Sequence, residues 1–257
     1  MSADVLDRIL DAKRARLERG EYGVPANADA PAPDGRRFVA SLRQPGVRII
    51  SEIKQRSPSA GEIVHALDGR IESFALAYRR GHAAAISVVT EEDHFGGRAG
   101  WIARARRISG LPVLMKDFLL EERQLDFAAA SGADAVLLIV RALAAAELAR
   151  LVGAARERGL ATLVEAHDED EIALAAKAGP DVLGVNARDL KTFRTDLPAM
   201  EKLAAAIPPG PVRLAESGIR TAEDVRRLRE AGWEAFLVGE TLLKAGDPEE
   251  TLKGLQR

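Results

Sequence analysis

Eight short runs rich in Val, Ile and Leu recur along the chain, and they constrain its fold more than any other feature. In chain order they are ISEIK, ISVVT, VLMKD, VLLI, TLVEA, LGVN, VRLAES and FLVG. Their apolar residues do not alternate with polar ones, which predicts strands buried on both faces, as in parallel sheets covered by helices. The stretches between them are helical in character, for example residues 71–80, 124–131, 144–158, 168–178 and 221–230. Strand and helix therefore alternate along most of the chain.

This alternation predicts an α/β fold, a (β/α)8 TIM barrel with an N-terminal helical extension. Such barrels typically take about 250 residues, and the chain has 257. The competing architecture is a doubly wound open sheet, which usually has about five or six strands and a glycine-rich turn after the first. Here the first run is followed by residues 57–61, Ser-Pro-Ser-Ala-Gly, which do not match that turn. The barrel is therefore preferred.

Composition and charge exclude several classes of protein. A hydrophobic content of 47% over this length suits a single large core. The formal net charge of -2 argues against a nucleic-acid partner. No apolar stretch is long enough to cross a membrane, and the N-terminus is charged where a signal peptide would be apolar, so we expect a cytoplasmic protein. The absence of cysteine excludes disulfides and thiolate chemistry.

Residues 1–45 form the helical extension that precedes a catalytic barrel domain at residues 46–257, and we expect the two to make one structural domain. A Pro/Ala/Asp-rich stretch at residues 22–35 divides the extension into two parts. The first part has one apolar stripe at helical spacing, made of Val5, Leu6, Ile9, Leu10 and Leu17. That stripe must pack on something. The sequence leaves three placements of this helix open: a plug under the barrel, one of an outer helix pair, or a cover over the substrate mouth.

Polar residues close most of the eight runs. They are Glu52 and Lys54 on the first run, Lys116 on the third, Glu165 on the fifth, Asn186 on the sixth and Glu216 on the seventh. In a barrel the carboxyl ends of the strands meet at one mouth, and alternate strands share an interior layer. Any one of these charges alone would be read as a solvated strand end or a structural salt bridge. Five buried charges together are costly unless they are paired and used, and lysines among carboxylates make an acid/base set.

Two glycines follow the last two strands, in Glu216-Ser217-Gly218 and Val238-Gly239-Glu240. In many barrels the loops after strands seven and eight bind phosphate through backbone N–H groups that a missing side chain leaves accessible. Either glycine alone is explained by a tight turn. The pair favours a phosphorylated small-molecule substrate, to which Ser57 can add a hydroxyl donor.

Several segments together resemble the indole-3-glycerol phosphate synthases, and the resemblance extends over almost the whole chain. The matching segments are VLDRILDAKR, SEIKQRSPSAGEI, ISVVTEEDHFGG, LPVLMKDFLLEERQL, SGADAVLLIV, TLVEAHDEDEI, LGVNARDLKTF, LAESGI and FLVGETLL. The resemblance implies a lyase of tryptophan biosynthesis that closes, decarboxylates and dehydrates a carboxyphenylamino deoxyribulose phosphate. It implies neither a cofactor nor a metal.

The resemblance also implies roles for individual residues. Lys116 would be the general acid on the substrate ketone and Glu165 the catalytic base. Lys54 would hold the substrate carboxylate and assist dehydration, with Glu52, Asn186 and Glu216 as supporting groups. The residues expected to bind the phosphate are Ser57, Ser217, Gly218, Gly239 and the backbone at Glu240. Arg188 matches the arginine of the family's N-x-R segment and is expected to bind the substrate. Those expected to enclose the aromatic ring are Phe95, Phe118, Leu137 and Leu190.

Small departures and competing interpretations remain. Many members of the family have a second Asn at the position of Ala187 and a polar or basic residue at that of Met115, and neither change affects the reacting groups. The acidic stretch at residues 168–171 is interpreted as a capping box, with Asp168 and Glu171 at the start of a helix, rather than a metal site.

The alternative functions are a Schiff-base aldolase using Lys54 or Lys116, and a barrel that binds a phosphorylated metabolite without turnover. A monomer is expected, with a weak homodimer as the alternative. No membrane or nucleic-acid partner is expected.

Overall fold

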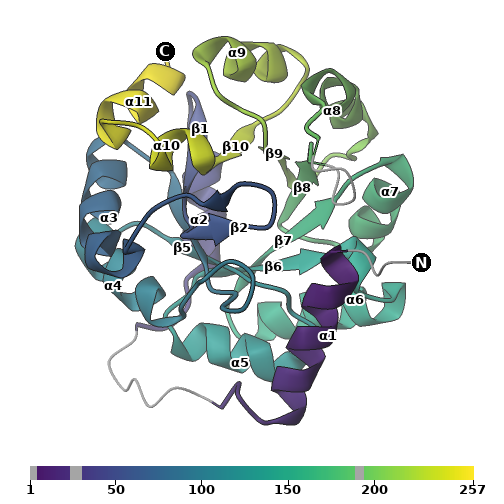
Figure 1. Ribbon diagram of the computed structural model, residues 1–257. Helices are drawn as coiled ribbons and strands as arrows, with labels where there is room; N and C mark the ends of the chain where they lie inside the picture. The colour runs from purple at the N-terminus through teal and green to yellow at the C-terminus, as the bar shows by residue number, and fades with distance from the viewer. Residues whose placement is uncertain (1–4, 24–30, 189–193) are drawn as a thin grey trace.

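The computed structural model describes residues 5–23, 31–188 and 194–257. Its centre is a closed parallel barrel (Figure 1) with the strand order β1-β10-β9-β8-β7-β6-β5-β4. The barrel strands are β1 (Arg48–Ile53), β4 (Ala85–Val89), β5 (Val113–Lys116), β6 (Ala135–Ile139), β7 (Ala161–Ala166), β8 (Val182–Asn186), β9 (Val212–Glu216) and β10 (Ala235–Val238). Each lies within or overlaps one of the eight apolar runs, so the predicted TIM barrel is confirmed.

The barrel interior consists of layers of side chains. One apolar layer comes from four alternate strands, and its residues Ile50, Leu114, Leu163 and Leu214 are fully buried. Side chains two positions apart on a strand share a face. The next interior residues on those four strands are therefore Glu52, Lys116, Glu165 and Glu216. An apolar floor thus lies directly below a charged layer.

Helices surround the strands. The outer layer contains α3 (Ile71–Arg80), α4 (Gly100–Ser109), α5 (Glu122–Ala130), α6 (Ala145–Glu157), α7 (Glu169–Ala178), α8 (Leu197–Leu203), α9 (Ala222–Glu230) and α11 (Pro248–Leu255), with the short helices η2 (Val140–Ala142), η3 (Ala204–Ala206) and α10 (Glu240–Leu243). The helical ranges expected from the sequence agree with α3, α5, α6, α7 and α9 to within a residue or two. Within the described part of the chain, no helix is both long and apolar enough to cross a membrane.

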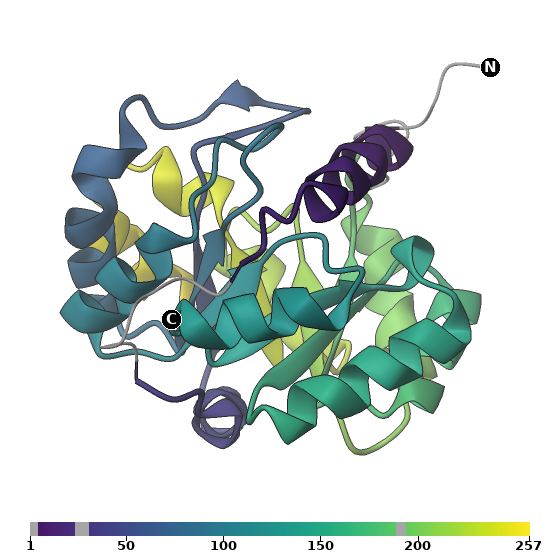
Figure 2. The ribbon, with the colours of Figure 1, turned by 90° about the horizontal axis from the view of Figure 1, so that it is seen from below.

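The two helices of the N-terminal extension lie at opposite ends of the barrel (Figure 2). Helix α1 (Val5–Glu18) lies over one side of the mouth, and helix α2 (Gly35–Leu42) lies beneath the barrel. Helix α2 packs so closely that a Cβ on Gly35 would be 2.4 Å from the backbone nitrogen of Ala161. Helix α1 therefore takes the cover placement, one of the three that the sequence left open for its apolar stripe, whereas α2 closes the other end of the barrel.

A buried ion pair fixes α1 beside the mouth. The Lys13 Nζ lies 2.6 Å from Asp117 Oδ1 and donates a hydrogen bond to the Tyr22 hydroxyl at 2.7 Å. Burial alone would lower the pKa of Lys13, but the attraction of Asp117 outweighs it and raises that pKa to about 12. The hydroxyl of Thr90 donates to the other oxygen of Asp117 at 2.8 Å. Because Asp117 directly follows Lys116, this network connects the helix to the charged layer.

The connection after β1 is long, as the sequence indicates, but it has structure of its own. It contains an antiparallel hairpin, β2 (Arg56–Ser57) and β3 (Gly61–Glu62), followed by the 3-10 helix η1 (Leu67–Arg70). Gly61 has a φ of +67°, in the left-handed region that favours glycine. This hairpin projects beside the barrel mouth, where Ser57 and Ser59 line the cavity described below.

Candidate active site

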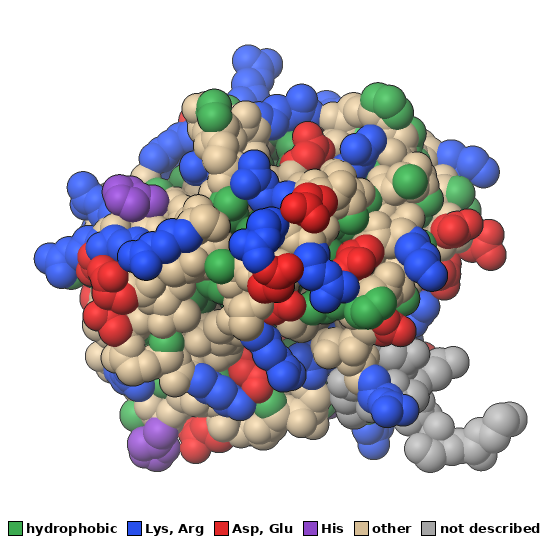
Figure 3. All heavy atoms as spheres, turned by 90° about the horizontal axis from the view of Figure 1, so that it is seen from above, with side chains coloured by type: hydrophobic (Ala, Val, Ile, Leu, Met, Phe, Trp, Pro, Cys, Tyr) green, Lys and Arg blue, Asp and Glu red, His purple; other side chains and the backbone are tan. Residues whose placement is uncertain are grey.

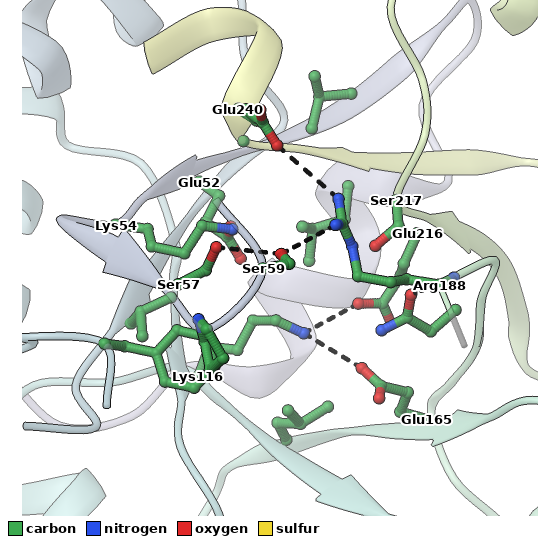
Figure 4. Close-up of a pocket in the computed structure, with 18 of the residues that line it drawn as sticks. Glu52, Lys54, Ser57, Ser59, Lys116, Glu165, Arg188, Glu216, Ser217 and Glu240 are labelled. Atoms are coloured by element: carbon green, nitrogen blue, oxygen red, sulfur yellow. Dashed lines mark hydrogen bonds and ion pairs between the residues drawn. The ribbon is translucent and has the colours of Figure 1, made fainter. Parts of the chain in front are cut away.

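A cavity of about 410 Å³ lies at the carboxyl ends of the strands (Figure 4). Small-molecule sites typically span about 300–1,000 Å³. The cavity is lined by every residue predicted for the site except Leu190, which lies outside the described residues. These residues are Glu52, Lys54, Ser57, Phe95, Lys116, Phe118, Leu137, Glu165, Asn186, Arg188, Glu216, Ser217, Gly218, Gly239 and Glu240. The structure thus brings together residues that are far apart in the sequence.

Lys116 lies between two buried carboxylates. Its Nζ is 2.9 Å from Glu216 Oε2 and 3.3 Å from Glu165 Oε2. Burial alone would lower the pKa of Lys116, but the attraction of Glu216, Glu165 and Glu52 outweighs it and raises the pKa above its usual value. The side chain is therefore an ammonium ion at neutral pH. It can protonate or electrostatically stabilise an oxygen in the cavity.

The two carboxylates around Lys116 differ in charge state. Burial tends to raise the pKa of Glu165, but Lys116 and His167 more than offset it, so that pKa is lowered. For Glu216, burial and repulsion from Glu165 and Glu52 exceed the attraction of Lys116 and raise the pKa to about 7. Titratable groups whose environments separate their pKa values are typical of acid/base sites. Glu165 is thus ionised at neutral pH, whereas Glu216 is poised between its two forms.

A second ammonium–carboxylate pair comes from the end of β1. Lys54 donates a hydrogen bond from Nζ to Glu52 Oε1. The strand is held from behind, because the hydroxyl of Tyr78 donates to the main-chain oxygen of Glu52 at 3.0 Å. Lys54 and Lys116 therefore enter the same cavity, each paired with at least one carboxylate.

Two glycines make room for the buried carboxylates. A Cβ on Gly239 would lie 2.5 Å from Glu52 Oε1, and one on Gly184 would lie 2.4 Å from Glu216 Oε1. Gly239 was predicted only as a phosphate-binding position, and the structure adds this steric reason. Gly184 was not predicted as a site residue, although a glycine inside a strand often marks the close approach of another group.

Arg188 bridges two loops at the rim of the cavity. Its Nη1 donates to Ser59 Oγ at 2.9 Å, and its Nη2 is 3.8 Å from Glu240 Oε2 (Figure 4). The hydroxyl oxygens of Ser57 and Ser59 are 3.2 Å apart. The hairpin after β1 is thereby connected across the mouth to α10.

The backbone after β9 has an unusual conformation beside this rim. Ser217 has a φ of +70° and Gly218 one of +79°. Such values are uncommon for residues other than glycine and cluster at functional sites. Two cations that were not predicted from the sequence, Arg220 and Lys244, also line the cavity. Their charge favours an anionic ligand group there.

Part of the cavity wall is apolar. The rings of Phe95 and Phe118 lie with their centroids 6.2 Å apart, and Leu137 also lines the cavity. Helix α1 adds Val5, Leu6 and Ile9, which the sequence marked only as an apolar stripe. This wall suits an aromatic or other flat apolar group.

Glu91 organises the loop that presents Phe95. It is fully buried and accepts backbone N–H hydrogen bonds from His94 at 2.7 Å and Phe95 at 2.9 Å. No role for this carboxylate was predicted from the sequence.

The acidic stretch after β7 caps helix α7, but it does not form the predicted capping box. Asp168 Oδ1 accepts from the backbone N–H of Glu171 at 2.9 Å, as expected for an N-cap. The Glu171 carboxylate instead accepts from the backbone N–H of His167 and from Arg141, because those donors compete with the cap residue. Over the described residues there is no group of three or more His, Asp or Glu placed to hold a metal ion.

Comparison with known proteins agrees with this geometry. The sequence profile of the family described as indole-3-glycerol phosphate synthase matches residues 6–255. The indole-3-glycerol phosphate synthase 2 of Streptomyces coelicolor is 49% identical over 94% of this chain and 93% of its own. The enzyme of Desulfosudis oleivorans is 43% identical over 98% of both chains.

Solved structures with low sequence identity support the fold alone. The 3-hexulose-6-phosphate synthase of Salmonella typhimurium has a TM-score of 0.64 at 15% identity and covers 82% of this chain and 97% of its own. Orotidine 5'-phosphate decarboxylase of Pyrococcus horikoshii has a TM-score of 0.62 at 14% identity, covering 81% of this chain and 97% of its own. Because the family profile spans nearly all residues and relatives approach half identity, the chain belongs to the indole-3-glycerol phosphate synthase family.

Proposed function

We propose that the cavity at the barrel mouth catalyses the reaction of this family, a step of tryptophan biosynthesis. A carboxyphenylamino deoxyribulose phosphate is closed to indole-3-glycerol phosphate with loss of carbon dioxide and water. The observation that carries the proposal is the partly buried Lys116, held by Glu165 and Glu216 in a cavity that also has an apolar wall and a cationic rim. The cavity thus offers an acid, a base and separate places for an aromatic ring and a phosphate.

Lys116 acts first, as general acid. The ring carbon that bears the substrate carboxylate attacks the ketone carbon, and the ketone oxygen becomes negative as the new bond forms. Lys116 donates its proton to that oxygen, which gives a hydroxyl group. The bond to the carboxylate then breaks, carbon dioxide leaves, and its electron pair restores the aromatic ring. A positioned general acid typically contributes about 10²–10⁴-fold to such a step.

Dehydration follows. The hydroxyl group leaves with a proton as water, and the neighbouring methylene carbon loses a proton to complete the indole double bond. We assign the acid to Lys54 and the base to Glu165, which is ionised because its pKa is lowered despite burial. Lys54 also holds the substrate carboxylate before it leaves, while Glu52, Asn186 and Glu216 support the two lysines and the base. No cofactor is required for this chemistry.

The rim binds the phosphate and the apolar wall encloses the ring. Backbone groups at Ser217, Gly218, Gly239 and Glu240 and the side chains of Ser57 and Arg188 lie on the rim. Their placement supports a phosphate site because the rim also includes Arg220 and Lys244. Phe95, Phe118 and Leu137 would then sandwich the anthranilate ring, and Leu190 remains a predicted member of that group.

The alternative functions fit the cavity less well. A Schiff-base lysine must be a free amine to attack a carbonyl, whereas the raised pKa of Lys116, due to three carboxylates that outweigh its burial, keeps it protonated. Borohydride with a keto-sugar phosphate would trap a Schiff base and should leave this protein unlabelled. A non-catalytic phosphate binder has no use for buried Glu52, Glu165 and Glu216, whose burial is costly.

We further propose a cytoplasmic monomer. One face of the molecule carries interspersed charges of both signs and scattered hydrophobic side chains (Figure 3). Among the described residues, Leu174, at 40% exposure, is the one large hydrophobic side chain that is extensively exposed. The described residues therefore offer no large exposed apolar patch, which a stable dimer interface usually contains. Sedimentation equilibrium at micromolar concentration tests the monomer against a weak homodimer.

Indole fluorescence provides the direct test of activity. The purified protein is mixed with the carboxyphenylamino deoxyribulose phosphate, and the increase in indole emission is followed. Catalytic turnover by the wild-type protein supports the proposal. Stoichiometric binding of substrate by a folded protein without product would favour the non-catalytic alternative instead.

A further inference from the structure

A buried imidazole lies directly behind the proposed catalytic base. His167 follows β7, two residues after Glu165, and its side chain is 5% exposed. It does not line the cavity, so it has no direct contact with a bound substrate. Any effect of His167 on the reaction must therefore act through Glu165.

One ring nitrogen of His167 is held by a second carboxylate. Nδ1 lies 3.1 Å from Glu171 Oε2, and the same oxygen accepts the backbone N–H of His167 at 2.9 Å. The other oxygen of Glu171 accepts from Arg141. An ionised carboxylate can only accept hydrogen bonds, so Nδ1 must carry a proton. Glu171 thus fixes both the orientation of the ring and the site of this proton.

The other ring nitrogen points to Glu165. Nε2 is buried without a hydrogen-bond partner and lies 3.6 Å from Glu165 Oε1. In the neutral ring Nε2 would direct a lone pair at a carboxylate oxygen, which is unfavourable. In the charged ring both nitrogens are donors and each faces a carboxylate. The geometry therefore favours the imidazolium form.

The charges around the ring agree with this assignment. The groups that face it are Glu165 on β7, Glu171 on α7 and Arg141 on η2. Burial and Arg141 lower the pKa of His167, but the hydrogen bond to Glu171 and the attraction of Glu165 outweigh them and raise it. In turn, Glu165 has Lys116 on one side and His167 on the other, with an additional hydrogen bond to Asn186.

We propose that His167 is a positioning residue that, as an imidazolium held by Glu171, keeps Glu165 ionised and aimed into the cavity. This inference rests on the proposed role of Glu165 as base. In this arrangement four side chains of alternating charge contact one another in the order Glu171, His167, Glu165 and Lys116. No group in this row other than Glu165 and Lys116 touches the cavity.

The test compares pH–rate profiles of His167→Gln and wild type. Loss of the cation should raise the pKa of Glu165, so the acidic limb of kcat/KM should move up by about one pH unit. Because the pKa of Glu165 starts below its usual value, a rise of about one pH unit leaves Glu165 ionised at pH 7, so kcat and KM there should each change less than about twofold. On the acidic limb, kcat/KM of the variant should be about tenfold lower than that of the wild type. Glu171→Gln should move the limb in the same direction by a smaller amount. A folded His167→Gln with the wild-type profile would overturn the proposal.

His82→Asn is the matched control. His82 is exposed and has a φ of +63°, a conformation that asparagine tolerates, so this variant should keep the wild-type profile.

Nitrogen-15 NMR of the four histidines measures the protonation of His167 directly, even if His167→Gln fails to fold. Both ring nitrogens should be protonated at pH 7, and a neutral ring would overturn the proposal. Loss of activity in Glu165→Gln with no effect of His167→Gln would refute this inference alone, whereas full activity of Glu165→Gln would refute the proposed base.

Discussion

Replacing Lys116 by methionine removes one charge from the centre of the charged layer, and it changes the volume of the side chain only a little. The side chain spans a similar length, so the apolar floor below it stays filled. Loss of the general acid should lower kcat by at least about 100-fold. KM should change much less, because the phosphate rim and the aromatic wall are intact. Indole fluorescence measures both constants.

The same variant should show a pH-dependent loss of stability. At pH 8 it leaves Glu165 and Glu216 buried without their shared cation, and removing one partner of a buried pair costs about 3–5 kcal/mol. These carboxylates then have folded-state pKa values above their unfolded ones, so the loss grows as pH rises through that interval and is small below it. A folded-state pKa that lies one pH unit above the unfolded value corresponds to about 1.4 kcal/mol of lost stability. In urea unfolding, the free energy of unfolding of Lys116→Met should therefore fall much further below that of the wild type at pH 8 than at pH 5.

Lys177→Met is the control, since Lys177 lies near the end of α7, away from the charged layer. It should match the wild type in both turnover and stability. Near-normal turnover of folded Lys116→Met, or a deficit independent of pH, would refute the reasoning from the buried charge cluster.

Three further predictions concern the base, the second carboxylate and the loop after β1. Glu165→Gln keeps the shape of the side chain and should reduce kcat by about 100-fold with little change in Tm; a loss of Tm as severe as the loss of activity would mark the residue as structural. Burial raises the pKa of Glu216 from 4.5 to about 7, so the wild type should lose stability as pH rises between these values. Urea unfolding of Glu216→Gln should lack that decline, a difference of about 1–3 kcal/mol between pH 5 and pH 8, and equal slopes would contradict the assignment. A product analogue should slow hydrogen exchange in residues 56–65, because the hairpin there contacts Arg188 across the mouth; unchanged exchange would leave the loop without a role as a lid.

The sequence predicted the barrel and the convergence of its charges because both follow from local pattern. Strands buried on both faces have a recognisable composition, and the carboxyl ends of parallel strands must meet. The position of α1 could not be predicted from the sequence. Its apolar stripe indicates that one face of the helix is buried, but it does not indicate which part of the barrel that face packs against. Its anchor, the Lys13–Asp117 pair, joins residues distant in the chain.

The steric roles of the glycines needed the structure for a similar reason. Gly184 on β8 faces Glu216 on β9, and Gly239, directly after β10, faces Glu52 on β1, so the register of neighbouring strands fixes each contact. The register depends on how two strands pair, so it cannot be predicted from the sequence of either strand alone. The capping box failed because Glu171 had competing donors in His167 and Arg141, one of which belongs to a different βα unit.

The most direct test of the central claim is the product balance with substrate labelled in its carboxylate carbon. Purified protein should release one labelled carbon dioxide for each indole-3-glycerol phosphate formed, at the same rate, and Lys116→Met should slow both together. Indole formation without equivalent carbon dioxide, or no conversion by a folded protein that binds the substrate, would contradict the account.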